Sequence, residues 1–407
     1  MKCGLLGEKL GHSYSPQIHR RLGEYSYSLF EKSSDELREF LENGDFTGLN
    51  VTIPYKKTVI AHCHGLSAVA QKLGAVNTIV RKPDGKLIGH NTDYFGFASM
   101  LRRSGLSPKG KRVLVLGTGG ASATVQAVLR EMGANVAVIS RTGKYNYDYM
   151  YRYLSTAIIV NATPVGMYPN NSETLVDLDR FPRLEGVLDL VYNPARTQLI
   201  MDAQKRNLVA ENGLWMLVAQ AKESAEWFLG QTIDDSLIEP IYRELSNQME
   251  NLVLIGMPGC GKSTVGKLLA HLLNRPFYDA DAEIEKYAGI SIPEIFSQKG
   301  EQEFRKIETA VLRELCKQSG AVIATGGGCV TRPENYPILR QNSHIIWLQR
   351  NLYSLATDGR PLSQIHTVFD LYESRKELYF QFSDYSIQND GDPETTVSKI
   401  ILAEESQ

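Results

Sequence analysis

Gly256 to Thr264 reads G-M-P-G-C-G-K-S-T and directly follows the apolar run Leu252 to Ile255. These residues match the pattern G-x-x-x-x-G-K-[ST], in which backbone N–H groups wrap a phosphate chain at the start of a helix. A strand, a glycine loop and then a helix is the context that this motif requires. The stretch therefore predicts a P-loop α/β domain that binds a nucleoside triphosphate.

The P-loop pattern also predicts the roles of individual residues in nucleotide binding. Lys262 bridges the β and γ oxygens of the nucleotide, and the Ser263 hydroxyl ligates Mg²⁺. The residues expected to hold the nucleotide are Gly259, Gly261, Lys262, Ser263 and Thr264. ATP and Mg²⁺ are the cofactors that this loop implies.

A glycine loop of a different kind lies upstream, at Gly117 to Ala121, after the apolar run 113–116. In a dinucleotide site the first glycine allows a tight turn and the second lets the backbone approach the pyrophosphate. The third fingerprint position is Ser122, so an ordinary strand-to-helix turn stays an alternative. About twenty residues further on, where NAD enzymes place an acid, the chain has Arg141, which favours NADP. A solvated arginine at a strand end is the alternative there.

Composition limits the classes of function. At 407 residues the chain exceeds one hydrophobic core, so two or three domains are expected. A net charge of −2 gives no reason to expect a nucleic acid or an anionic membrane as partner. The five cysteines are odd in number and scattered, which argues against a disulfide framework or a zinc site. No apolar run approaches the roughly 20 residues that cross a bilayer, and we expect a cytoplasmic enzyme.

The apolar pattern predicts an α/β chain throughout. A helix is expected at 35–43, and strands are expected at 49–53, 77–81, 113–116, 135–140, 157–161 and 187–190. The apolar helical stretch 213–229 is expected to pack back on the first part of the chain, and 233–248 completes that helical tail. We therefore predict a discontinuous domain at 1–96 and 212–247, a Rossmann-like domain at 97–211 and a P-loop domain at 249–407.

Residues 1–245 resemble shikimate dehydrogenases, because their short motifs occur in the order seen in that family. The motifs are S-Y-S-P at 13–16, N-V-T-I-P-Y-K at 50–56, G-A-V-N-T at 74–78, N-T-D at 91–93, the loop at 117–121, N-A-T-P-V-G-M at 161–167, D-L-V-Y-N-P at 189–194 and the stretch 213–220. The resemblance implies a two-domain dehydrogenase, with an α/β substrate domain and an NADP domain, that reduces 3-dehydroshikimate to shikimate.

The same resemblance implies that Lys56 and Asp93 contact the reacting oxygen. An ammonium donates the proton or stabilises the alkoxide, and a carboxylate beside it orients the lysine. Lys57 follows directly, so a surface lysine is the alternative for Lys56. The residues implied to bind the substrate are Ser13, Ser15, Thr52, Asn77, Tyr192 and Gln220. Those implied to bind NADP(H) are Gly117, Gly119, Gly120, Ala121, Ser140, Arg141, Thr142, Thr163 and Gly213.

Residues 249–395 resemble shikimate kinases, and this implies a nucleoside-monophosphate-kinase-like α/β fold. The motifs are D-A-D at 279–281, Phe304-Arg305 before Glu308, G-G-G at 326–328, R-P-L at 360–362 and Arg375. By that match Asp279 supports Mg²⁺ and Asp281 accepts or orients the acceptor hydroxyl. The other roles go to arginines and glycines: Arg305 and Arg375 clamp the substrate carboxylate, Arg360 closes over the phosphates, and the backbone of Gly326, Gly327 and Gly328 approaches the ring. Solvated helix faces are the alternative for each arginine.

Two spacings depart from these families. The chain between Thr142 and Asn161 is short for a crossover helix and an extra strand, so we expect a trimmed cofactor sheet. The chain between Trp347 and Arg360 is short for a helix and a lid. The stretch His62-Cys63-His64 has no further ligands at suitable spacing, and we expect no metal there.

The two resemblances together predict one bifunctional enzyme. It would reduce 3-dehydroshikimate with NADPH and then phosphorylate shikimate with ATP, and these small molecules are the expected partners. Oligomeric state stays open. One alternative is a quinate-type dehydrogenase fused to a different small-molecule kinase. Another is a binding or regulatory protein in which one catalytic half is degenerate.

Overall fold

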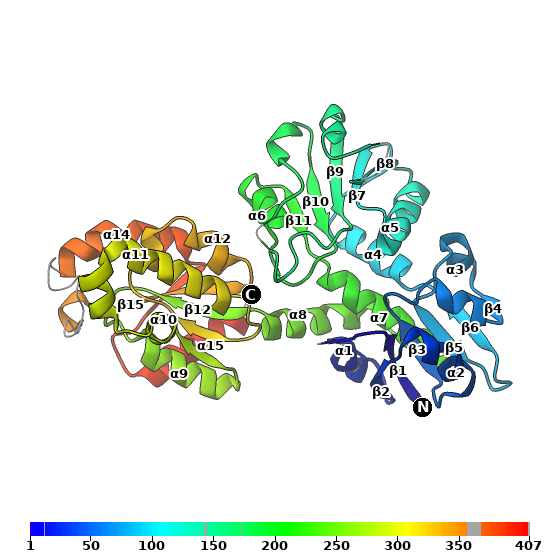
Figure 1. Cartoon of the computed structure of the whole chain (residues 1–407), viewed down its shortest axis with the longest axis horizontal. Helices are drawn as coiled ribbons and strands as arrows, with labels where there is room; N and C mark the ends of the chain where they lie inside the picture. The colour runs from blue at the N-terminus through cyan, green and yellow to red at the C-terminus, as the bar shows by residue number, and fades with distance from the viewer. Residues whose placement is uncertain (12, 142–144, 172, 356–367, 406–407) are drawn as a thin grey trace. The chain divides into compact units, whose positions relative to one another are not determined.

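The computed structural model describes residues 1–407 apart from 12, 142–144, 172, 356–367 and 406–407. The described residues build three β-sheets, each packed against helices (Figure 1). By backbone contacts the chain divides into two compact units, Met1–Tyr192 with Leu199–Glu244, and Asn193–Gln198 with Leu245–Gln407. Two of the sheets belong to the first unit and one to the second, which confirms the predicted α/β class.

The first sheet has the strand order β2-β1-β3-β5-β6-β4. Its strands are β1 (Lys2–Gly7), β2 (Ser26–Glu31), β3 (Gly48–Val51), β4 (Gly65–Leu66), β5 (Thr78–Arg81) and β6 (Leu87–His90). Its helices are α1 (Ser15–Leu22), α2 (Ser34–Asn43) and α3 (Ala68–Leu73). Strand β5 runs antiparallel to both β3 and β6, whereas β1 is parallel to β2 and β3. The core of this sheet gathers the apolar residues of β3 and the buried face of α2.

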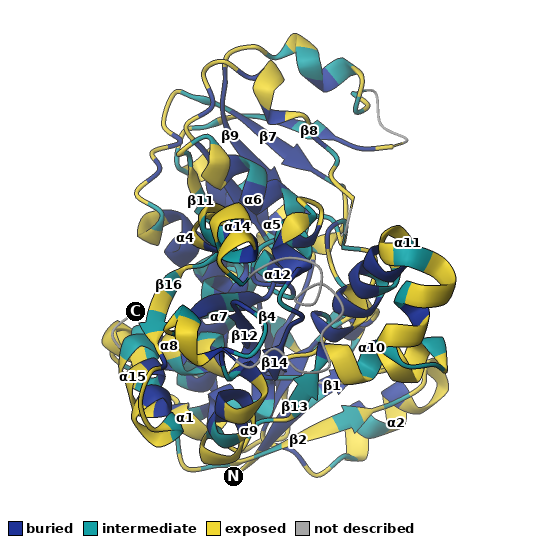
Figure 2. Cartoon of the chain, turned by 90° about the vertical axis from the view of Figure 1, so that its left-hand side faces the viewer, coloured by how far each residue is buried: buried dark blue, intermediate teal, exposed yellow. Residues whose placement is uncertain are grey.

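The second sheet is parallel throughout its described strands, in the order β11-β10-β9-β7-β8. The strands are β7 (Arg112–Leu116), β8 (Asn135–Ile139), β9 (Thr156–Asn161), β10 (Gly186–Asp189) and β11 (Val209–Glu211). Val113 and Val115 face one core of the unit, and Leu114 and Leu116 face the other. Both faces of the sheet are therefore covered, which explains the continuous apolar runs in its strands. Figure 2 shows β7 and β9 as buried strands.

The connection from β8 to β9 is short, as its spacing indicated. Among its described residues only Tyr149–Arg152 are helical, and they form one turn of 3₁₀ helix, η2. Met150 in this turn is fully buried in the same core as Leu114 and Leu116. Tyr145, Tyr149 and Tyr153 contact one another ring to ring beside it. An irregular, tyrosine-rich segment thus packs on the sheet in place of the crossover helix for which the connection is too short.

Helix α7 (Leu214–Leu229) packs back on the first part of the unit, as predicted for 213–229. It contacts α4 (Asp93–Arg103), α1 and β5. A Cβ atom on Gly96 of α4 would meet the Met216 carbonyl oxygen at 2.8 Å, so the missing side chain allows the two helices to approach closely. The remaining helices of this unit are α5 (Gly120–Glu131) and α6 (Gln198–Lys205), and α8 (Ile238–Met249) leads into the second unit.

The third sheet is also parallel, in the order β13-β14-β12-β15-β16. Its strands are β12 (Asn251–Ile255), β13 (Phe277–Asp279), β14 (Val322–Ala324), β15 (Ser343–Gln349) and β16 (Tyr385–Gln388). Its helices are α9 (Lys262–Leu273), α10 (Ala280–Ala288), α11 (Ile292–Leu315), α12 (Asn335–Arg340), α14 (Val368–Phe382) and α15 (Pro393–Glu405). One continuous core joins the strands to the apolar faces of these helices.

The contact-based division differs from the predicted domain boundaries at two places. The second unit starts at Leu245, within α8, and it includes the earlier segment Asn193–Gln198. The backbone N–H of Arg196 donates to the carbonyl of Gln341 at 2.8 Å, and its guanidinium pairs with the buried Glu250 at 2.7 Å. A backbone hydrogen bond and a buried ion pair thus make this segment part of the second unit.

The described helices include none that is both long and apolar enough to span a bilayer. Over the same residues, no group of histidine, cysteine or acidic side chains has the arrangement of a metal site. The five cysteines are free thiols.

Candidate active sites

A pocket of 290 Å³ in the first unit contains the predicted catalytic pair and all the predicted substrate residues of the dehydrogenase. The predicted residues in its lining are Ser13, Ser15, Thr52, Lys56, Asn77, Asp93, Tyr192 and Gln220, together with Ala121 and Gly213. Most of them come from loops and helix starts that follow strands of both sheets of this unit, whereas Asn77 directly precedes β5 and Gln220 lies within α7. The fold therefore brings together residues that are far apart in the sequence.

Lys56 and Asp93 form an ion pair with 2.6 Å between Nζ and Oδ2. Their side chains are 26% and 13% exposed, so the pair is sheltered but faces the pocket. The other carboxylate oxygen of Asp93 accepts a hydrogen bond from Asn77 Nδ2 at 2.9 Å. Asp93 also begins α4, where the N-terminal end of the helix favours a negative charge. Both oxygens of the carboxylate are thus held, and the ammonium is directed by one of them.

Tyr192 and Gln220 supply polar groups from two other elements. Burial raises the pKa of Tyr192, so its hydroxyl stays a neutral hydrogen-bond donor at physiological pH. Its ring meets Tyr14 edge to face, with 6.5 Å between centroids. Gln220 projects from α7, and its Nε2 donates to the Leu217 carbonyl at 2.9 Å. Hydroxyl and amide groups of this kind suit a polyhydroxylated acid.

The glycine loop at the start of α5 has the conformation that a dinucleotide site needs. Gly117 has φ +102°, and a Cβ there would meet Thr163 Cγ2 at 2.8 Å. A Cβ on Gly119 or Gly120 would meet nothing within 4 Å, so this side of the loop is open. Ser122 is fully buried and donates from Oγ to the Gly117 carbonyl at 2.6 Å. The serine at the third fingerprint position therefore fixes the turn, and the loop fits an approaching pyrophosphate.

The other predicted cofactor residues that the structure describes follow β8, β9 and β11, and they differ in exposure. Ser140 is buried after β8, and Arg141 is exposed beside it. Thr142 lies outside the described residues. Thr163 follows β9 and donates from Oγ1 to Asn161 at 2.7 Å. A Cβ on Gly213 would collide with the Leu190 backbone, so this glycine permits the close approach of α7.

Sequence reasoning assigned no role to Asn161 and Asp189, which form a buried pair at the ends of β9 and β10. Asn161 Nδ2 donates to Asp189 Oδ1 at 2.8 Å, and the same oxygen accepts from the Val191 backbone at 3.0 Å. The pair fixes the two loops that carry Thr163 and Tyr192. The sequence signal that could have identified the pair is a polar residue at the last position of each apolar strand, Asn161 in β9 and Asp189 in β10.

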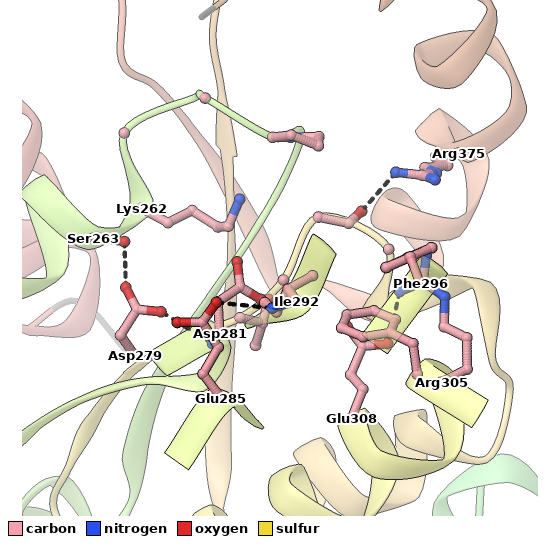
Figure 3. A pocket seen from close by; sticks show the side chains of 18 of the residues that line it. Lys262, Ser263, Asp279, Asp281, Glu285, Ile292, Phe296, Arg305, Glu308 and Arg375 are labelled. Carbon is pink, nitrogen blue, oxygen red and sulfur yellow. Dashed lines mark hydrogen bonds and ion pairs between the residues drawn. The ribbon is translucent and has the colours of Figure 1, made fainter. Parts of the chain in front are cut away.

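A pocket of 470 Å³ in the second unit contains the residues predicted for phosphoryl transfer (Figure 3). Its predicted members are Gly259, Gly261, Lys262, Ser263, Thr264, Asp279, Asp281, Arg305, Gly326, Gly327, Gly328 and Arg375. Arg360 lies outside the described residues. Glu285 and Glu308 also line this pocket, and no role was predicted for either from the sequence.

The P-loop turns through three left-handed glycines, Gly256, Gly259 and Gly261, with φ of 142°, 80° and 97°. Only glycine adopts such angles readily, which explains this part of the motif. Lys262 Nζ donates to the carbonyls of Gly256 and Met257 at 2.9 and 3.0 Å, so the ammonium lies against its own loop.

Ser263 and Asp279 are placed as a pair of oxygen ligands. Ser263 Oγ donates to Asp279 Oδ2 at 2.5 Å, and Asp279 also caps α10 by accepting from the Asp281 backbone. A hydroxyl and a carboxylate beside a phosphate loop fit Mg²⁺, which prefers oxygen ligands.

Asp281 lines the pocket, and its side chain is exposed there (Figure 3). The surrounding pocket walls partly desolvate this carboxyl group and raise the pKa of Asp281, and Asp279 adds to the effect, although Lys262 and Arg305 oppose it. A carboxylate with a raised pKa is a better proton acceptor, which suits a general base.

The three successive glycines at 326–328 are surrounded by the protein's own side chains. A Cβ on Gly326 would meet Glu308 Oε1 at 2.8 Å, and one on Gly327 would meet Pro258 Cδ at 2.5 Å. A Cβ on Gly328 would collide with the guanidinium of Arg305. The missing side chains therefore make room for residues of the pocket itself, in addition to the predicted approach of a ring.

Arg305 and Arg375 reach the same pocket from α11 and α14. Arg305 pairs with the fully buried Glu308 at 2.8 Å, and Arg375 donates to the Gly327 carbonyl at 3.3 Å. Burial raises the pKa of Glu308, although the adjacent Arg305 opposes this shift. Tyr379 also donates to the Gly327 carbonyl. The positions of both guanidinium groups are thus set by contacts within the pocket.

Family models match both units of the chain. One described as the shikimate dehydrogenase substrate binding domain matches residues 5–79, and one described as shikimate kinase matches residues 258–404. The shikimate dehydrogenase (NADP(+)) of Clostridium perfringens strain SM101 is 37% identical over 264 residues, which cover 60% of this chain and 97% of that protein.

Solved structures agree with these matches. A chorismate mutase/shikimate 5-dehydrogenase fusion protein from Clostridium acetobutylicum superposes with a TM-score of 0.57 and 35% identity, covering 60% of this chain and 96% of that one. Shikimate 5-dehydrogenase from Thermus thermophilus, in complex with NADP(H) and shikimate, has a TM-score of 0.55 and 32% identity, covering 60% of this chain and 99% of that one. The chain therefore belongs to the shikimate dehydrogenase family and continues into a shikimate kinase domain.

Proposed function

We propose that this chain catalyses two consecutive reactions on one small acid. The first unit reduces 3-dehydroshikimate to shikimate with NADPH, and the second phosphorylates the 3-hydroxyl of shikimate with ATP. The observation that carries this proposal is the gathering of Lys56, Asp93 and six polar residues in one pocket, on a chain whose second unit is a shikimate kinase domain.

In the reduction, NADPH supplies the hydride when it is bound. Lys56 is assigned to the ketone oxygen, where its ammonium donates a hydrogen bond and then a proton to the developing alkoxide. Asp93 keeps the ammonium in place through their 2.6 Å contact. Ser13, Ser15, Thr52, Asn77, Tyr192 and Gln220 are assigned to the carboxylate and hydroxyls of the ring.

The preference for NADPH is assigned to Arg141. Its exposed guanidinium follows β8, where the 2′-phosphate of NADP is met in a dinucleotide-binding sheet. A charge-assisted contact of this kind predicts that Arg141→Ser raises the KM for NADPH about tenfold or more and changes the KM for NADH little. Initial rates with both cofactors check this, and a wild-type enzyme that prefers NADH would contradict the assignment.

In the phosphorylation, Asp281 is assigned to the 3-hydroxyl of shikimate as the proton acceptor. Lys262 is assigned to the β and γ oxygens, and Ser263 and Asp279 would hold Mg²⁺, which neutralises phosphate charge when bound. Arg305 and Arg375 are assigned to the substrate carboxylate. Arg360 stays the residue proposed to close over the phosphates.

A coupled assay with the full-length protein tests both assignments. Given 3-dehydroshikimate, NADPH and MgATP, the protein is expected to oxidise NADPH and release ADP in equal amounts. Omission of NADPH should abolish ADP release, and added shikimate should restore it. Release of ADP that does not depend on shikimate, or oxidation of NADPH that does not depend on 3-dehydroshikimate, would refute the corresponding half of the proposal.

A further inference from the structure

We infer that Ser224 is a positioning residue for the reduction, although it does not line the substrate pocket. The inference rests on the proposed dehydrogenase function. Ser224 lies on α7, one turn after Gln220, and is fully buried. Through a cluster of buried hydroxyls it fixes the Asn77 amide, which in turn holds Asp93 and thereby Lys56.

Ser224 is the centre of a cluster that joins three elements of the first unit. Its Oγ lies 2.9 Å from Thr92 Oγ1, before α4, and 3.0 Å from Thr78 Oγ1, on β5. It accepts a hydrogen bond from Asn50 Nδ2, on β3, at 2.7 Å. It also donates to the carbonyl of Gln220 on its own helix at 2.9 Å. All of these partners except Gln220 are buried in the protein.

The cluster meets the catalytic pair through Asn77. Asn77 Oδ1 accepts from the Thr92 backbone at 2.7 Å and from Thr78 Oγ1 at 3.0 Å. A backbone N–H is always a donor, so this contact identifies the amide oxygen and leaves Nδ2 on the opposite side. Nδ2 then donates to Thr92 Oγ1 at 3.0 Å and to Asp93 Oδ1 at 2.9 Å.

One arrangement of hydrogens satisfies this chain from end to end. Ser224 gives its proton to the Gln220 carbonyl, so it accepts from Thr92, whose own lone pair accepts from Asn77. Ser224 uses its one proton and both acceptor sites here, because Asn50 Nδ2 is its second donor. Thr78 gives its proton to Asn77 Oδ1, so its 3.0 Å approach to Ser224 is a close contact without a hydrogen bond in this arrangement. Removing the Ser224 hydroxyl leaves the Thr92 and Asn50 donors without this acceptor in a site that excludes water. The Thr92 hydroxyl then turns to its longer contacts, Asn77 Oδ1 at 3.2 Å or Gln220 Oε1 at 3.4 Å, and Asn77 is the member that touches Asp93.

The cluster contains hydroxyls and amides but no charged side chain. Loss of the Ser224 hydroxyl should therefore change the geometry of the site without removing a charge from it. Substrate would touch Asn77, Asp93 and Gln220, whereas Ser224, Thr78 and Thr92 lie behind the pocket lining. We therefore expect loss of Ser224 to disturb the placement of Lys56 more than the affinity for the substrate. Geometry of the reacting groups governs turnover more strongly than it governs binding.

The test is Ser224→Ala in the full-length protein, assayed for both activities. The kcat of dehydroshikimate reduction should fall about five- to tenfold, the scale of one lost buried hydrogen bond, with the KM for dehydroshikimate within about threefold of wild type. Shikimate kinase turnover serves as an internal control and should not change. Absence of reduction by the wild-type protein would instead refute the proposed function itself.

Ser99→Ala is the matched control. Ser99 is a buried serine on α4 whose hydroxyl accepts from Trp215 Nε1 at 2.9 Å, so the same substitution again deprives a donor of its partner. Both variants should lower the melting temperature, but only Ser224→Ala should lower the kcat of the reduction. Equal kcat losses in the two variants, or a wild-type kcat in Ser224→Ala, would overturn the inference.

A second pair of variants decides the question should Ser224→Ala fail to fold. Thr92→Val removes the hydroxyl that lies between Ser224 and Asn77 but keeps the shape of the side chain, whereas Thr92→Ser keeps the hydroxyl. Thr92→Val should lower kcat by a similar factor, and Thr92→Ser should stay close to wild type. Where Ser224→Ala does fold, the kcat losses of Ser224→Ala and Thr92→Val should be less than multiplicative in the double variant, because both act through one chain of hydrogen bonds. Equal kcat values for the two Thr92 variants would refute the inference.

Discussion

The two pockets hold their reactive groups by different means. In the first unit a single ion pair, Lys56 with Asp93, is backed by neutral amides and hydroxyls. In the second unit several charged residues line one pocket, and desolvation raises the pKa of both the pocket-exposed Asp281 and the buried Glu308. Neutral hydrogen bonds fix geometry with a small desolvation cost, whereas enclosed charges alter proton affinity at a larger cost. The comparison indicates that the first pocket is built for position and the second for charge.

The largest expected effect tests the pocket of the second unit. Asp281→Asn keeps the shape of the side chain but removes the proton acceptor, so shikimate phosphorylation should fall by at least about 10³-fold. ATP should still bind, because Lys262 and the P-loop are unchanged, and NADPH-dependent reduction should continue. ADP release and ATP titration check these points. Phosphorylation within tenfold of wild type would exclude Asp281 as the base.

The next largest effect tests the pocket of the first unit. Lys56→Ala removes the group assigned to the alkoxide, and the kcat of the reduction should fall roughly 10²- to 10⁴-fold. The KM for dehydroshikimate should change far less, because the polar residues that hold the ring remain. Lys57→Ala is the matched control, since the neighbouring lysine is exposed. If both variants retained near-normal turnover, Lys56 would be an ordinary surface lysine.

Glycine substitutions should affect the two pockets differently, with smaller changes in rate than the substitutions above. A Cβ on Gly328 would displace the guanidinium of Arg305, whereas one on Gly119 has free space around it. Gly328→Ala should therefore raise the KM for shikimate in the kinase reaction about tenfold or more, the loss of one charge-assisted contact. Gly119→Ala should leave that reaction unchanged, and it should raise the KM for NADPH if a dinucleotide approaches the loop. A normal KM for shikimate in Gly328→Ala would show that Arg305 does not bind the carboxylate.

A pH titration gives the smallest effect and concerns the second unit alone. His344 lies 3.3 Å from Glu250 and 2.7 Å from Glu404. Burial lowers the pKa of His344, but hydrogen bonds to the two carboxylates outweigh burial and raise it to about 9. A raised pKa stabilises the folded unit fully below about pH 6.5, and this stabilisation is lost as the pH rises through about 9.

The free energy of unfolding of this unit should therefore fall by roughly 1–3 kcal/mol between these pH values. Kinase activity that survives graded urea at each pH provides the measurement. His344→Gln should flatten the pH dependence, and His271→Gln, at an exposed position of α9, should not. An equal pH dependence in wild type and His344→Gln would contradict this prediction.

Much of both pockets could be predicted because the decisive signals are local. The P-loop, the D-A-D motif and the N-T-D motif each place their residues within a few positions of one turn or helix start. Ser224 could not be found in this way, because its partners Asn50 and Thr78 lie 174 and 146 positions away in the chain. Only the packing of α7 on β3, β5 and α4 gives that serine its neighbours. The close contact between Gly328 and the Arg305 guanidinium could not be predicted from the sequence either, because it depends on the rotamer of Arg305.

The short connection after β8 could be predicted from the sequence only in part. Its length predicted that the usual crossover helix is missing, and a single 3₁₀ turn is found among its described residues. The pattern did not predict what covers the sheet instead. The closely spaced tyrosines were visible as an odd composition, but their packing beside Met150 depends on the curvature of the segment, which no sequence period encodes.

The segment Asn193–Gln198 has a practical consequence for dividing the protein. A kinase excised from Leu245 onward would lose Arg196, and the buried carboxylate of Glu250 would be left facing His344 without its guanidinium partner. Breaking a buried ion pair in this way costs about 3–5 kcal/mol, a large part of the stability of a small domain. A single cut in the gene therefore cannot keep Arg196 with the kinase unit, and a separately expressed kinase would need another cation to pair with Glu250.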